Sequence, residues 1–98
     1  MEVLLLHRPR GILGPELLKA AMELGKQIIA KGGTSYVARN QALIICLVDT
    51  PSIDNVIPTC EQMNMIGWDT EIIPVEKSAD AMPKMEKALA EMEKMIKK

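Results

Sequence analysis

Side chains that can take part in chemistry are few in this chain, and the single histidine is the first of them. His7 lies next to Arg8 at the end of the apolar run VLLL. A neutral imidazole can transfer protons near neutral pH and can also bind a metal ion. We therefore interpret His7 as the candidate catalytic residue and His7 with Arg8 as candidate ligand contacts. The alternative is a strand-end histidine that bonds only the backbone or water.

Three further side chains are candidate ligand contacts because each carries a polar group next to an apolar segment. Trp68 offers an indole N–H, Tyr36 a hydroxyl and Glu71 a carboxylate. The alternative for the two aromatic residues is simple packing. Glu71 acts in a site only if strand alternation turns its carboxylate into a cavity.

The remaining polar or sulfur groups are weaker candidates, and whether Cys60 and Met63 ever bind a soft metal is left open. Asp49 and Thr50 follow an apolar run, and we interpret them as turn or cap residues because antiparallel pairing holds them away from His7. Cys60 and Met63 can bind soft metals, but helical spacing places both on a core stripe. One histidine and two separated cysteines do not make a zinc set. We expect no metal site and no cofactor.

The amino-acid composition of the chain limits the classes of partner that it is expected to bind. The chain has 98 residues, 48% of them apolar, which suits one globular domain. Twelve basic and thirteen acidic side chains give no net field for nucleic acid or an anionic membrane. No apolar run approaches the length of a membrane span, and MEVLLLHRPR does not resemble a signal peptide. We expect Cys46 and Cys60 to be buried, reduced thiols, and the protein to be cytoplasmic, with no nucleic-acid or membrane partner.

Two apolar runs of the sequence predict the strands around which the rest of the fold is arranged. The stretch Ala42–Thr50, ALIICLVDT, has seven consecutive apolar residues, and VLLL shares its character. Because side chains of a strand alternate between two faces, strands of this kind must be covered on both. The sequence therefore predicts two central strands.

The sequence pattern predicts four strands and three helices. A Pro inside the second helix, Pro58, predicts a kink or a loose first turn with the firm helix starting near Ile57. The first helix carries an apolar stripe of Leu18, Ala21, Met22, Gly25, Ile28 and Ile29. The predicted strands are Glu2–Arg8, Thr34–Arg39, Ala42–Asp49 and Trp68–Val75, and the predicted helices are Pro15–Lys31, Thr50–Gly67 with Thr50 as its N-cap, and Ala79–Lys97.

This order, β-α-β-β-α-β followed by a helix, predicts an α+β fold of the ferredoxin-like type. Right-handed crossovers place both crossover helices on one face of a four-stranded antiparallel sheet of order 4-1-3-2. That order puts the two doubly apolar strands at the centre. We expect one domain, 1–98, with a core over 1–76 and a C-terminal helix over 78–97.

The second face of this sheet has no obvious cover. A large apolar patch rarely faces water in a monomer. The last helix carries a seam of Met82, Met85, Leu89, Met92 and Ile96 at alternating spacings of three and four. We expect a homodimer through the open sheet face and the C-terminal helix. Whether that helix covers its own sheet or the partner's is left open.

Several features together resemble the dimeric α/β-barrel superfamily, and within it the small GYD-type domains. These are the element order, the length near 100, the DTPS turn after the central strand and the IIPV of the last strand. The resemblance implies the fold and dimerisation. The superfamily includes monooxygenases, isomerases, dehydratases and haem-handling proteins, so the resemblance fixes no reaction.

The functional expectation is a small homodimeric domain that binds a small ligand in a cavity near His7. One alternative is a non-enzymatic structural or interaction module. Another is a small enzyme of the monooxygenase or isomerase type found in the same superfamily. Whether the chain is an enzyme is left open.

Overall fold

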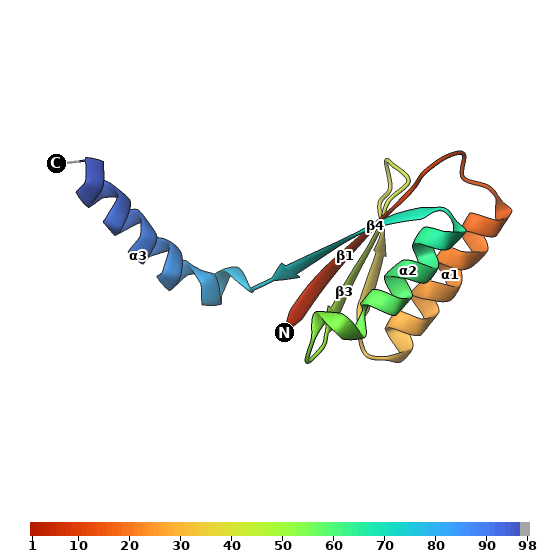
Figure 1. Ribbon diagram of the computed structural model, residues 1–98, viewed down its shortest axis with the longest axis horizontal. Coiled ribbons are helices and arrows are strands. Elements are labelled where there is room, and N and C mark those ends of the chain that lie inside the picture. The colour runs from red at the N-terminus through yellow and green to blue at the C-terminus, as the bar shows by residue number, and fades with distance from the viewer. Residues whose placement is uncertain (97–98) are drawn as a thin grey trace.

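The computed structural model of the chain describes residues 1–96, so the predicted helix end at Lys97 lies outside the described residues. Its centre is a four-stranded antiparallel sheet of order β2-β3-β1-β4 (Figure 1). The strands are β1 (Glu2–Pro9), β2 (Thr34–Val37), β3 (Ile44–Asp49) and β4 (Trp68–Val75). The two strands with apolar side chains on both faces, β1 and β3, lie at the centre. The predicted ferredoxin-like α+β fold is confirmed.

Helices α1 (Pro15–Ala30) and α2 (Ile57–Ile66) cover the same face of the sheet (Figure 1). Pro15 opens α1, where its missing N–H costs nothing, and Glu16 follows at the positive end of the helix dipole. The core forms between this helical layer and the sheet. It consists of Val3, Leu5, Leu24, Ile28, Ile44, Cys46, Cys60, Met63 and Trp68.

The second helix starts later than a cap at Thr50 predicts, and that prediction is wrong. A short 3₁₀ turn, η1 (Ile53–Asn55), precedes α2, and the side chain of Ser52 caps it by accepting from Asp54 N at 3.2 Å. Thr50 is instead occupied in its own turn, with its hydroxyl donating to the carbonyl of Ser52 at 3.0 Å. The expected loose first turn and the firm helix from Ile57 are confirmed, because Pro58 stands within the first positions of α2.

The apolar stripe of α1 is only partly buried, which corrects the predicted stripe. Leu24 and Ile28 are buried, whereas Leu18, Met22 and Ile29 are exposed. The apolar arc of α1 is wider than the strip of sheet beneath it. The exposed part borders an apolar groove of about 240 Å³ beside the edge strand β2. At Gly25, in the middle of the stripe, a Cβ would lie 3.7 Å from Ser35 Oγ, which is an ordinary contact, so the close approach of α1 to β2 does not require a glycine there.

Helix α3 (Ser78–Ile96) leaves the sheet and extends away from it (Figure 1). The molecule measures 59 × 28 × 23 Å and has a radius of gyration of 17.4 Å. A compact chain of this length has a radius of about 13 Å. An ion pair from Lys84 Nζ to Glu76 Oε1, 2.9 Å, spans the start of α3. In a single copy, α3 therefore covers neither face of the sheet.

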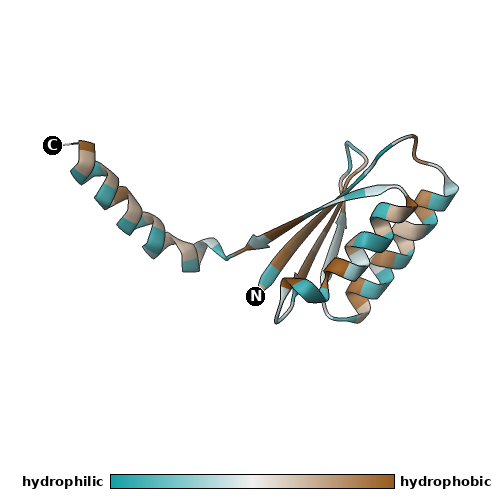
Figure 2. Cartoon of the chain, in the orientation of Figure 1, coloured by the Kyte–Doolittle hydropathy of each residue, from teal (hydrophilic) through white to brown (hydrophobic). Residues whose placement is uncertain are grey.

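The face opposite α1 and α2 is termed the open face, and among residues 1–96 no helix packs on it (Figure 1). The strands that form it are largely hydrophobic (Figure 2). Its side chains come from the alternate positions of the strands, those that point away from the buried Val3, Leu5 and Cys46. The apolar members are Leu4, Leu6, Tyr36, Ile45, Leu47, Ile73 and Val75.

Candidate functional site

Strand alternation divides the five predicted site residues between the two faces of the sheet. His7 and Trp68 lie on the face that the helices cover and are buried. Arg8, Tyr36 and Glu71 lie on the open face and are exposed. The structure therefore does not bring the five together into one site.

His7 is fully buried, at 0% exposure, between the sheet and the helical layer. Its Nδ1 lies 2.8 Å from Thr70 Oγ1 on the neighbouring strand β4, while Nε2 has no partner among residues 1–96. Burial lowers the pKa of His7 to about 4, because the low-dielectric core disfavours the imidazolium. At pH 7 the ring is neutral and can exchange a proton only with a group that enters this layer.

Thr70 is the partner that the sequence did not indicate. It pairs with His7 in the register of β1 and β4, and its backbone N–H donates to Asn64 Oδ1 at 3.1 Å. These bonds fix the position of the imidazole from the β4 side. Only the strand register identifies Thr70, and the sequence carries no motif for it.

Trp68 is a core residue, at 2% exposure. Its indole Nε1–H donates to the carbonyl of Leu17 on α1 at 3.1 Å. The N–H that made Trp68 a ligand candidate is thus used to join β4 to α1. This contact matches the packing alternative for Trp68.

The three candidates on the open face are spread across it. Tyr36, Ile45, Leu6 and Glu71 occupy one cross-strand row, so Tyr36 and Glu71 stand three strand spacings, about 14 Å, apart. Arg8 and Glu71 border a shallow hollow on β1 and β4 with Leu6 and Asp69. In one copy, Arg8 and Glu71 therefore lie at a polar margin of the open face, and Tyr36 lies at its opposite edge on β2.

The two cysteines are buried, free thiols, as predicted. Burial raises the pKa of Cys46, and it raises the pKa of Cys60 to about 11. Both sulfurs are therefore protonated and unreactive at neutral pH. Within residues 1–96, no three His, Cys, Asp or Glu side chains gather as a metal site would require.

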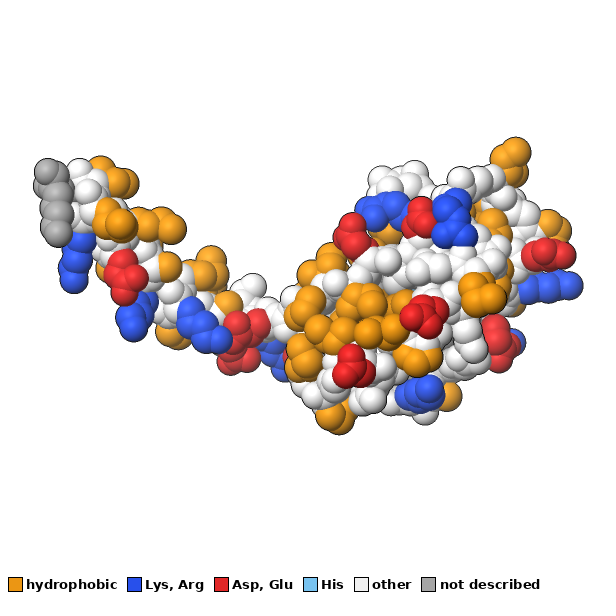
Figure 3. All heavy atoms as spheres, in the orientation of Figure 1, with side chains coloured by type: hydrophobic (Ala, Val, Ile, Leu, Met, Phe, Trp, Pro, Cys, Tyr) orange, Lys and Arg blue, Asp and Glu red, His pale blue; other side chains and the backbone are white. Residues whose placement is uncertain are grey.

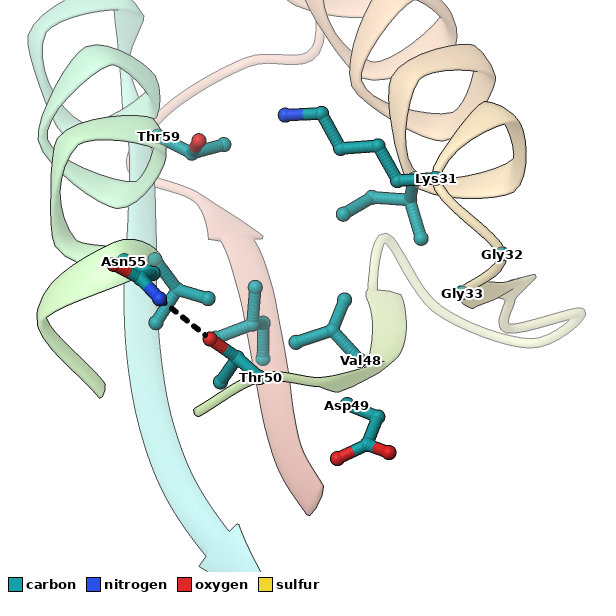
Figure 4. Close-up of a pocket in the computed structure, with 11 residues that line it drawn as sticks. Lys31, Gly32, Gly33, Val48, Asp49, Thr50, Asn55 and Thr59 are labelled. Atoms are coloured by element: carbon teal, nitrogen blue, oxygen red, sulfur yellow. Dashed lines mark hydrogen bonds between the residues drawn. The ribbon is translucent and has the colours of Figure 1, made fainter. Parts of the chain in front are cut away.

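A pocket of about 230 Å³, termed the end pocket, opens between the C-terminus of α1 and the start of α2 (Figure 4). Its apolar wall comes from Leu5, Ile28, Val48 and Val56, and its polar groups include Lys31, Thr50, Asn55 and Thr59. Sequence reasoning missed these residues, since they lie far apart in the chain and form no motif.

Fold and site define the chain as a ferredoxin-like α+β protein with one uncovered sheet face. A comparison of the chain with protein-family models, curated proteins and solved structures gave no match. Among the described residues, no helix has the length and apolar character needed to cross a membrane.

Proposed function

We propose that this chain is a homodimeric assembly module in which the open face and α3 pack against a second copy. One observation carries the proposal: two apolar surfaces, the open face and the stripe of α3, are both uncovered in a single copy. Figure 3 shows hydrophobic side chains recurring along α3 between charged ones, and a hydrophobic patch on the body of the protein. Apolar surface of this extent on a protein marks an interaction site.

The open face suits a second sheet. Its centre is formed by half-buried Leu4, Leu6, Ile45 and Leu47 on the two central strands. Charged side chains such as Arg8 and Glu71 stand only towards its margins. An apolar centre with a polar margin is the arrangement of stable interfaces, and two such sheets pack at about 10 Å.

The area of the open face supports the participation of α3 in the proposed interface. The strands have eight, four, six and eight residues. At about 3.3 Å per residue and 4.8 Å per strand, they present about 400 Å². A standard interface buries about 800 Å² from each partner. The 19 residues of α3 add a strip about 28 Å long and 10 Å wide, which brings the total to about 700 Å².

The apolar stripe along α3 is wide enough to pack against a broad surface of another chain. The large apolar side chains of α3 are between 54% and 83% exposed. The seam of Met82, Met85, Leu89, Met92 and Ile96 is widened on one side by Ala81, Ala88 and Met95. A stripe this wide suits a broad surface, whereas a strict two-position seam suits a pair of helices. We propose that α3 packs on the partner copy.

The resemblance to dimeric α/β barrels supports this arrangement, and membership of that superfamily and a cytoplasmic location are part of the proposal. The small ligand near His7 stays a prediction, and the unpartnered Nε2 is the observation that favours it. A monooxygenase or isomerase activity stays a prediction that follows only from the resemblance.

The oligomeric state of the full chain tests the proposal. Size-exclusion chromatography with light scattering should give the mass of two chains. Leu47→Lys, at the centre of the open face, should give one chain with an unchanged circular dichroism spectrum. Ile12→Lys, on a residue 96% exposed in the loop before α1, is the matched control and should remain a dimer. A monomeric wild-type protein, or a dimeric Leu47→Lys variant, would contradict the proposal.

A further inference from the structure

The end pocket has an apolar interior and a polar mouth. Leu5 and Val48 from the central strands, with Ile28 from α1, form the interior. In Figure 4 the side chains of Lys31 and Thr59 lie on opposite sides of the mouth and extend towards each other. The pocket lies on the helical side of the sheet, away from the open face.

Most donors around the pocket are already used. The N–H of Gly32 donates to the carbonyl of Ile29 at 3.0 Å, and that of Gly33 to Ile28 at 2.9 Å. The side-chain amide of Asn55 donates to Thr50 Oγ1 at 3.2 Å. The loop after α1 therefore offers no cluster of free N–H groups of the kind that holds a phosphate.

Two donors remain at the mouth. Neither Lys31 Nζ nor Thr59 Oγ1 has a hydrogen-bond or ion-pair partner within residues 1–96. The carboxylate of Asp49 also lines the pocket, but it pairs with the amino group of Met1 at 3.1 Å and points away from Lys31 (Figure 4). The polar groups left free at the mouth are thus a single ammonium, on Lys31, and a hydroxyl on the opposite side, on Thr59.

The volume limits the size of a ligand. At about 30 Å³ per water, 230 Å³ corresponds to about seven or eight waters. A molecule of about six to eight non-hydrogen atoms fills this space. We propose that the end pocket binds a short-chain aliphatic monocarboxylate, with the carboxylate held by Lys31 and Thr59 and the alkyl chain against Leu5, Ile28 and Val48.

The competing ligand classes fit less well. A phosphate or dicarboxylate has more charge than one ammonium balances, and the glycine N–H groups are occupied. A cation is repelled by Lys31. A neutral alcohol fills the apolar interior but loses the charge-assisted bond at the mouth. This site is independent of the proposed dimer, because it uses the other side of the sheet.

Hexanoate tests the proposal. The ¹⁵N-labelled full chain is titrated at pH 7 and constant ionic strength, and amide shifts are followed by NMR. Saturable shifts should centre on Lys31, Gly32 and Thr59. Lys31→Gln should raise the Kd about tenfold, the usual effect of losing a charge-assisted bond. The matched control Lys26→Gln, five residues earlier in the chain on α1 and outside the pocket, should leave the Kd unchanged.

Hexylammonium and 1-hexanol, titrated in the same way, separate charge recognition from apolar binding. Both should bind at least about tenfold more weakly than hexanoate. Hexylammonium binding as tightly as hexanoate would overturn the proposal. So would an equal Kd for Lys31→Gln and Lys26→Gln, shifts centred on the open face, or shifts that do not saturate.

Discussion

Acid should destabilise this protein through His7, and the structure gives both the sign and the size of the effect. The pKa of His7 is about 4 in the folded chain and about 6.5 in an unfolded one. Above pH 6.5 both states carry a neutral imidazole, so the residue adds no pH dependence. Between pH 6.5 and 4 the unfolded state binds a proton that the folded state does not. The free energy of unfolding therefore falls as the pH falls, and levels off below about pH 4.

The magnitude follows from the difference of the two pKa values. Each pKa unit corresponds to about 1.4 kcal/mol, so the full shift is worth about 3 kcal/mol. The steepest loss is about 1.2 kcal/mol per pH unit, near pH 5. A small domain has a stability of about 5–15 kcal/mol, so this loss is a large part of the total.

Urea unfolding at pH 7, 6, 5 and 4.5 and at fixed protein concentration measures this loss. The variant His7→Gln has no group that titrates in this range at position 7, and its curve carries the contribution of the carboxylates alone. The difference between the two proteins should shrink by about 2 kcal/mol from pH 7 to pH 5. Since His7 is the only histidine, its ring signals in NMR also report the folded pKa without assignment. A folded pKa near 6.5, or parallel stability curves for the two proteins, would refute the reasoning.

Three further substitutions test the packing. Gly67→Ala should lower the stability by about 1–3 kcal/mol in urea unfolding, because φ is +131° and the new Cβ would lie 3.0 Å from Leu17 Cδ2; an unchanged midpoint would contradict this strain. Trp68→Phe should cost about 1–3 kcal/mol by thermal or urea unfolding, because it removes the N–H bonded to Leu17 and part of the core volume; a neutral result would mean that this bond is not formed. Leu89→Lys, on the exposed stripe of α3, should raise the dimer Kd at least tenfold in sedimentation equilibrium while the circular dichroism spectrum of the folded chain stays the same; an unchanged Kd would exclude α3 from the interface.

The fold was predictable because its strongest signals are local. The runs in β1 and β3 are apolar on both faces, which only central strands tolerate, and the order of elements then leaves one sheet order. Pro58 likewise marked where α2 becomes regular. The error at Thr50 came from the same kind of signal. Thr50 and Ser52 both carry a capping hydroxyl two residues apart, and only the tertiary position of η1 decides between them.

The site was less predictable because the alternation of side chains along a strand does not say which face of the sheet the helices cover. Alternation places His7 with Val3 and Leu5, but Leu4 and Leu6 on the other face are equally apolar. The sequence alone therefore does not decide which of these two sets of side chains faces the helices. The position of Thr70 beside the imidazole depends further on the register of β1 and β4, which a one-residue slip would change.

The two proposals use opposite sides of one sheet, and the distribution of unsatisfied groups explains why. On the open face the uncovered groups are apolar, and burial of apolar surface is non-directional, so a large and flat partner satisfies them best. At the end pocket the unpartnered groups are an ammonium and a hydroxyl above a small apolar interior, and these need a partner with one anionic end. A second copy of the chain offers the first kind of surface and is too large for the second. The central strands β1 and β3 contribute to both, with Leu6 and Leu47 on one face and Leu5 and Val48 on the other, so the same doubly apolar strands that fix the fold also separate assembly from ligand binding.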